Sequence, residues 1–137
     1  MKQVNFSFTN KTKQKVPSRD LLFVLENFLK KMRIKNPVEV NLIIVGKKLI
    51  QKLNYIYRKK NKPTDVLSFP IDITDPKKIP KSGNVVLGDI YICQQMVEKG
   101  KLEDTFLHGL IHLIGYDHEK DEKKWDEVLK QIKIPAK

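Results

Sequence analysis

The sequence of 137 residues contains a single cysteine, Cys93, so no disulfide can form within the chain. A lone cysteine fits a reducing compartment, and by default it is a small buried apolar side chain. No apolar run approaches the roughly 20 residues that a membrane-spanning helix needs. Residues 1–10 alternate apolar and polar positions, so they lack the continuous apolar stretch of a signal peptide. We therefore expect a cytoplasmic protein without a membrane segment.

Acidic residues are scarce relative to basic ones. The chain has 16 Asp and Glu against 27 Lys and Arg, which gives a formal net charge of +11. An excess of this size attracts polyanions, so nucleic acid, an anionic membrane or an acidic protein are candidate partners for the lysine-rich surface. The alternative is that the charge serves solubility alone. The only arginines are Arg19, Arg33 and Arg58, so few residues could supply a planar, two-pronged donor.

Glycine and proline are few, and apolar residues recur with clear periods, so most of the chain is expected to be helix or strand. A period of two or a β-branched run predicts strands over residues 3–9, 38–46, 65–72 and 83–92. Helical spacing and capping residues predict helices over residues 18–32, 47–58, 94–101, 105–114 and 121–134. We expect one α+β domain over residues 1–137, with a mixed sheet of about four strands packed with about five helices.

All three histidines of the chain fall in one segment, HGLIHLIGYDH, at residues 108–118. On a helix, His108 and His112 lie about 40° apart on one face. No residue from position 105 to 115 carries a formal charge, whereas a surface helix would show a charged stripe. We therefore predict a buried helix whose imidazole face lines a pocket. Gly115 is placed to end this helix in a left-handed conformation, so that the next turn returns His118 to the same face.

This spacing suits a metal ion. Imidazoles at positions i and i+4 can share one ion, and three protein ligands leave a fourth position open, as in catalytic zinc sites. The alternative is that the three histidines are ordinary core residues, at a cost of about 1–3 kcal/mol for each imidazole buried without a partner. The frame is similar to that of metzincin proteases, but those enzymes place a general-base glutamate where this chain has Gly109. We therefore do not expect a protease.

Three blocks of the sequence resemble one known family. HGLIHLIGYDH resembles the signature of the YbeY family of bacterial rRNA maturation factors, which are described as zinc-dependent, single-strand-specific endoribonucleases. NYIYRKKNKPTDVLSFP, at residues 54–70, and LGDIYIC, at residues 87–93, resemble two further segments of that family. The resemblance covers about the C-terminal two-thirds of the chain.

The resemblance implies one Zn²⁺ per chain, bound by His108, His112 and His118. It also implies that Arg58 is the family's functionally important arginine, which would stabilise charge on a phosphate during metal-assisted hydrolysis. Asp117 would orient a ligating imidazole, with capping of the turn as the equal alternative. The implied function is cleavage of single-stranded RNA in rRNA maturation, with 16S rRNA 3′-end processing and ribosome quality control. The implied partners are rRNA and the ribosome or a small-subunit precursor.

Two other functions remain open from the sequence. The first is a non-catalytic assembly factor that binds RNA or the ribosome and uses zinc only to hold its fold. The second is a metallohydrolase acting on a peptide or a small amide, which the absence of a glutamate at position 109 and the positive charge both disfavour.

Overall fold

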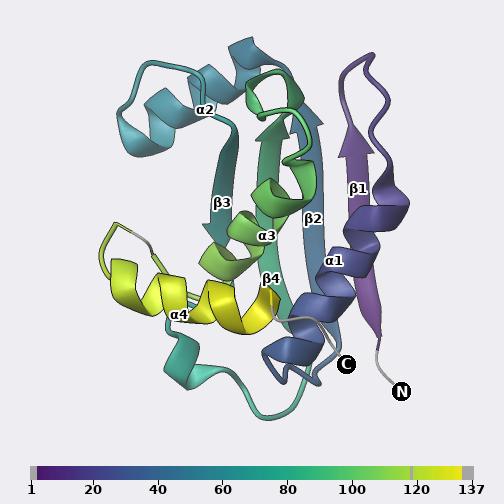
Figure 1. The fold of residues 1–137 in the computed structure, drawn as a ribbon, viewed down its shortest axis with the longest axis vertical. Coiled ribbons are helices and arrows are strands. Elements are labelled where there is room, and N and C mark those ends of the chain that lie inside the picture. Colours follow the sequence, from purple (N-terminus) through teal and green to yellow (C-terminus); the bar gives the residue numbers. More distant parts are fainter. Residues whose placement is uncertain (1–2, 118, 134–137) are drawn as a thin grey trace.

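Four strands form one mixed sheet in the computed structural model, which describes residues 3–117 and 119–133 (Figure 1). In chain order they are β1 (Val4–Asn10), β2 (Val38–Val45), β3 (Val66–Pro70) and β4 (Val85–Cys93). Their spatial order is β1-β2-β4-β3. The pairs β1–β2 and β2–β4 are parallel, and β3 runs antiparallel to β4. The predicted mixed sheet of four strands is confirmed, and β3 lies at its edge.

The described residues contain four α-helices, one fewer than the five expected. They are α1 (Ser18–Lys31), α2 (Lys47–Arg58), α3 (Leu102–Leu113) and α4 (Glu122–Lys133). The helix predicted over residues 94–101 is only a 3₁₀ turn, Gln94–Met96, because Val97 is extended and Gly100 has a φ of +79°. None of the helices in the described ranges has the length and apolar character to cross a membrane.

The two faces of the sheet carry different layers of helix. On one face, alternate side chains of β4 such as Ile90 and Ile92 join α1, α3 and α4 in the main core. On the other face, α2 packs through Ile50 against a smaller cluster that includes Cys93. Cys93 has no exposed surface, which confirms that it is a buried apolar side chain. Each large aliphatic side chain buried in these layers contributes about 1.5–3 kcal/mol to folding.

The histidine-bearing helix α3 approaches the sheet unusually closely at Gly109. A Cβ atom at this position would lie 2.9 Å from Cγ2 of Ile90 and 3.1 Å from Oγ of Ser68. A side chain at this position would force Ile90 or Ser68 to shift, and seven of the twelve residues of α3 are buried. The predicted buried helix is thus confirmed, and its contact places the histidines beside the edge strand β3.

The polar, proline-rich segment between β3 and β4 is anchored to the domain. The side-chain amide of Asn36 donates hydrogen bonds of 3.1 Å to the carbonyl oxygens of both Pro80 and Gly83. Ile73 is also buried in the main core. This segment continues to Thr74 and Pro76, which pack against the turn that follows α3.

Candidate active site

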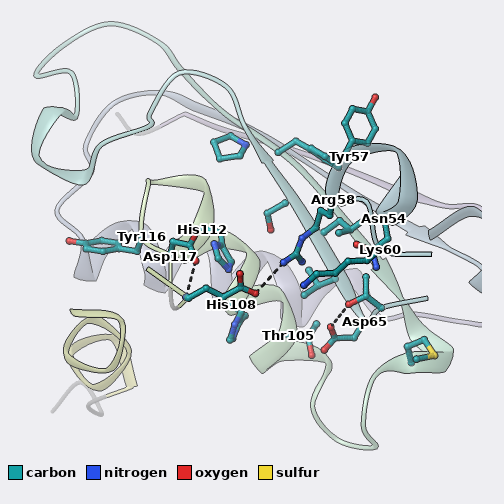
Figure 2. Close-up of a pocket in the computed structure, with 18 of the residues that line it drawn as sticks. Asn54, Tyr57, Arg58, Lys60, Asp65, Thr105, His108, His112, Tyr116 and Asp117 are labelled. Atoms are coloured by element: carbon teal, nitrogen blue, oxygen red, sulfur yellow. Dashed lines mark hydrogen bonds and ion pairs between the residues drawn. The ribbon is translucent and has the colours of Figure 1, made fainter. Parts of the chain in front are cut away.

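A cleft of about 1080 Å³ runs along the edge strand β3 (Figure 2). Helix α3 lies on one side of this edge, because Ser68 of β3 contacts it from the main-core face. The C-terminal end of α2 lies on the other side, because the ring of Tyr57 packs against that of Phe69, whose side chain belongs to the smaller cluster on that face. Helices packed on opposite faces of this sheet line a common cleft at its edge, and this topology determines which residues meet.

The first wall carries two of the predicted metal ligands. His108 and His112 lie one turn apart on α3, half-buried, with ring centres 5.8 Å apart. Both rings pack on the indole of Trp125 in α4, at 4.5 and 4.7 Å between ring centres. Trp125 is only 3% exposed, so α4 backs the two imidazoles from behind. This contact restricts the rotation of both rings and was not anticipated from the sequence.

The turn after α3 has the conformation expected for the end of that helix. Gly115 has a φ of +100°, and its N–H donates a 3.0 Å hydrogen bond to the carbonyl oxygen of His112. A Cβ atom at Gly115 would also lie 2.8 Å from the carbonyl oxygen of Thr74, so both conformation and space require glycine. His118, the third predicted ligand, lies outside the described residues.

The spacing of the two histidines on α3 fits a shared zinc ion. Two imidazoles that share a tetrahedral zinc, with bonds of about 2.0–2.1 Å, have ring centres roughly 5 Å apart. The 5.8 Å between His108 and His112 is within a small side-chain rotation of that separation. Neutral imidazole nitrogens are ligands that zinc prefers. Residues 3–117 and 119–133 contain no group of three or more His, Cys, Asp or Glu side chains that could hold a metal ion.

The second wall places Arg58 at the last position of α2. The next residue, Lys59, has a left-handed conformation with a φ of +61°, and its N–H donates to the carbonyl oxygen of Tyr55 at 3.0 Å. The buried side chain of Asn54 donates a 2.9 Å hydrogen bond to the carbonyl oxygen of Lys62, which ties the following loop back to the helix. These bonds hold the end of α2 in place, and Arg58 is the last residue of that helix, as the sequence predicted.

An ion pair joins the two walls across the cleft. Nη2 of Arg58 lies 3.2 Å from Oε1 of Glu119, with side-chain exposures of 39% and 56% (Figure 2). Arg58 and the two histidines line the same cleft although at least 50 residues separate them in sequence. Glu119 was not among the predicted site residues, since nothing in the sequence pairs it with a residue 61 positions earlier.

Asp117 caps the turn between α3 and α4. Its Oδ1 accepts a 2.9 Å hydrogen bond from the N–H of Glu119, and its carbonyl oxygen accepts from the N–H of Asp121. This is the alternative that the sequence placed beside orientation of a metal ligand. The orienting role remains a prediction.

Charge is distributed unevenly around the cleft. The lining itself holds four basic and four acidic side chains: Arg58, Lys60, Lys62, Lys120, Asp65, Asp104, Asp117 and Glu119. By contrast, residues 47–62, here called the basic segment, contain seven Lys or Arg and no acidic residue. The basic segment comprises α2 and the loop after it, so the positive charge borders the cleft on the Arg58 side. That this segment belongs to the predicted lysine-rich binding surface remains a prediction.

Comparison with known proteins connects this arrangement to one family. The sequence profile described as Endoribonuclease YbeY matches residues 5–134. The chain belongs to the YbeY family. Proteins called Endoribonuclease YbeY from Francisella tularensis subspecies tularensis and novicida are 34% and 33% identical to it, over 98% of this chain and 84% and 87% of theirs. The solution structure of TM1509 from Thermotoga maritima superposes with a TM-score of 0.59 at 33% identity, over 93% of this chain and 84% of that one.

Membership of the YbeY family confirms the resemblance drawn from the three sequence blocks. The match also includes residues 5–53 and helix α4, where no family motif was identified from the sequence. Three cleft or backing residues were missed: Glu119, Trp125 and Asn54. Asn54 begins one of the quoted blocks, so a signal existed for it, but a role for its side chain becomes visible only in the folded chain.

Proposed function

We propose that this protein is a zinc-dependent endoribonuclease that cleaves single-stranded RNA during rRNA maturation. Family membership supports RNA cleavage, because the curated relatives are called endoribonucleases. The observation that carries the proposal is that a guanidinium and two imidazoles face one cleft from opposite walls. We further propose that the protein acts in the cytoplasm in 16S rRNA 3′-end processing and in ribosome quality control. Its larger partner would be the ribosome or a small-subunit precursor.

His108, His112 and His118 would hold one zinc ion on the α3 wall. The half-buried pair on α3 supplies two nitrogens, and Trp125 restricts the orientation of both rings. When bound, zinc supplies a Lewis acid that polarises a phosphoryl oxygen. Asp117 would help to orient a ligand, in addition to the capping of the turn that it performs through Oδ1.

Arg58 would act as the catalytic residue on the opposite wall. A guanidinium can donate two parallel hydrogen bonds to a phosphate, and its fixed position at the end of α2 means that little reorganisation is needed. Glu119 already occupies this donor at 3.2 Å, as a phosphate oxygen would in the complex. The RNA must therefore displace or share the contact with Glu119.

The basic segment would supply affinity that does not depend on sequence. Lysines along a cleft follow the phosphate backbone, and release of counterions drives this type of binding. Lys60 and Lys62 line the cleft directly beside Arg58. The backbone of a single strand can therefore pass along the α2 wall while one phosphate faces the histidines.

The test is cleavage of a single-stranded RNA with enzyme in excess, comparing the unmodified protein with Arg58→Lys and His112→Ala. Arg58→Lys keeps the charge and loses the planar donor, so we expect near-normal RNA binding and a cleavage rate about 10²-fold lower. His112→Ala should be inactive, which also controls for a contaminating nuclease. Equal rates for the unmodified protein and Arg58→Lys would exclude this role for Arg58. Equal rates for all three proteins would assign the cleavage to a contaminant and favour the non-catalytic assembly factor.

A further inference from the structure

A large aromatic side chain stands exposed at the rim of the cleft. Tyr57, in the last turn of α2, is 63% exposed although it lines the cleft next to Arg58. Figure 2 shows its ring at the edge of the site, on the same helix end as Arg58 and directed away from the two histidines. An exposed aromatic ring therefore stands beside a cationic side chain at the rim of the cleft.

The ring of Tyr57 is supported from below by the sheet. Its centre lies 5.0 Å from the ring of Phe69 in β3, in an edge-on arrangement with an interplanar angle of 65°. Phe69 in turn packs edge-on against Tyr91 in β4, at 5.7 Å and 81°. These two strands are hydrogen-bonded neighbours, so the supporting rings are held rigidly. An edge-on contact leaves ring-face area of Tyr57 open to solvent.

The same helix offers a contrasting tyrosine. Tyr55 is 55% exposed, but it does not line the cleft. Among the residues that the structure describes, Tyr55 has no ring packed against it. Of the two tyrosines on α2, Tyr57, the one next to Arg58, is therefore the one whose ring is supported by another aromatic ring.

We propose that Tyr57 is a stacking platform for one nucleobase of the single-stranded RNA, next to the phosphate that Arg58 binds. This inference rests on the proposed function and identifies part of its substrate site. Binding sites for single-stranded nucleic acid combine two components: cationic side chains that follow the phosphate backbone, and aromatic faces on which bases stack. Here Arg58, Lys60 and Lys62 supply the first component and Tyr57 supplies the second.

The platform gives a physical reason for preference for single strands. A base within a duplex has both faces covered by its neighbours, so it cannot stack on a side chain without being unstacked first. A base in a single strand has a free face, and every base has such a face, so the contact tolerates sequence variation. The neighbouring contacts to phosphate also lack sequence information. The combination selects strandedness, with little selection for sequence.

The experiment couples a protein variant to a change in the RNA. A set of single-stranded RNAs, each with one abasic position in turn, is bound to the unmodified protein, Tyr57→Ala, Tyr57→Phe and Tyr55→Ala. One abasic position should weaken binding to the unmodified protein by at least about 5-fold, the low end for loss of one base–aromatic stack. That position should have no further effect in Tyr57→Ala, because its stacking partner is already gone. Tyr57→Phe and Tyr55→Ala should behave like the unmodified protein.

The outcomes separate this inference from the proposed function. If the unmodified protein binds RNA and the abasic effects simply add to that of Tyr57→Ala, the platform is refuted while the nuclease proposal stands. If the unmodified protein does not bind single-stranded RNA, the proposed function fails and the platform fails with it. Circular dichroism of each variant checks that the fold is retained, which is expected because both tyrosines are exposed.

Discussion

We predict that Glu119 and a phosphate of the RNA compete for the guanidinium of Arg58. The two side chains meet across the cleft at 3.2 Å, and the carboxylate occupies a position on the guanidinium that an RNA phosphate would need. Glu119→Gln removes the negative charge while keeping the size of the side chain. We therefore expect Glu119→Gln to bind single-stranded RNA more tightly than the unmodified protein.

The size of the gain follows from the distance and the exposure. Two unit charges 3.2 Å apart in water attract by about 1.3 kcal/mol before screening by salt. Because both side chains are more than a third exposed, screening and lost side-chain entropy reduce this to about 0.2–1 kcal/mol. If binding of a phosphate gives up that amount, removing the pair tightens binding by about 1.4- to 5-fold.

The assay is fluorescence anisotropy with a labelled single-stranded RNA at fixed salt. Glu26→Gln is the matched control, because it changes the net charge equally from an exposed position on α1 that does not line the cleft. In an Arg58→Gln background, Glu119→Gln should gain no more than Glu26→Gln does. Equal affinities of the two single variants would refute competition. Weaker binding by Glu119→Gln would instead show that Glu119 positions Arg58 for the phosphate.

Three further predictions concern metal, salt and packing. Metal analysis should find one zinc per chain and none in His112→Ala, and zinc should change the fluorescence of Trp125, the only tryptophan, because both imidazoles pack on it. Protein that remains metal-free after incubation with zinc would refute the site. RNA affinity should fall linearly with salt on a log–log plot, with a slope of about 0.7 per phosphate contacted, whereas a flat series would favour a protein partner. Gly109→Ala should lower the free energy of unfolding by about 1 kcal/mol in denaturant titrations, because overpacking against Ile90 and Ser68, about 1–3 kcal/mol, exceeds the gain in helix propensity. An increase in stability would contradict the close approach of α3.

Local sequence patterns predicted the elements of the fold better than their arrangement. The uncharged run around the histidines predicted a buried helix, and β-branched runs predicted the strands, because both signals arise from which faces are buried. The spatial order β1-β2-β4-β3 was not predicted, since strand order depends on contacts between distant segments. The sequence predicted a helix over residues 94–101, but the structure has only a 3₁₀ turn at residues 94–96. The chain leaves helical conformation near Gly100 through its backbone dihedral angle, and such a change leaves the pattern of polar and apolar residues unaltered.

The same division applies to the site. The proximity of His108 and His112 was predictable because they lie one helical turn apart. Arg58 was assigned from resemblance, and its place opposite the histidines depends on β3 lying at the sheet edge. Glu119 and Trp125 entered the site only through long-range contacts, for which a single sequence carries no signal.

The position of Gly109 in the structure adds a second reason against protease chemistry. The absence of a glutamate beside the first histidine disfavoured protease chemistry because the general base was missing. In the structure, position 109 faces Ile90 and Ser68 in the sheet, whereas His108 faces the cleft. A carboxylate at 109 would therefore be buried between helix and sheet, away from the cleft that the two histidines line. The rotation of α3 on the sheet thus argues against protease chemistry independently of which residue stands at 109, and under the proposed function the opposite wall, with Arg58, would supply the second catalytic group.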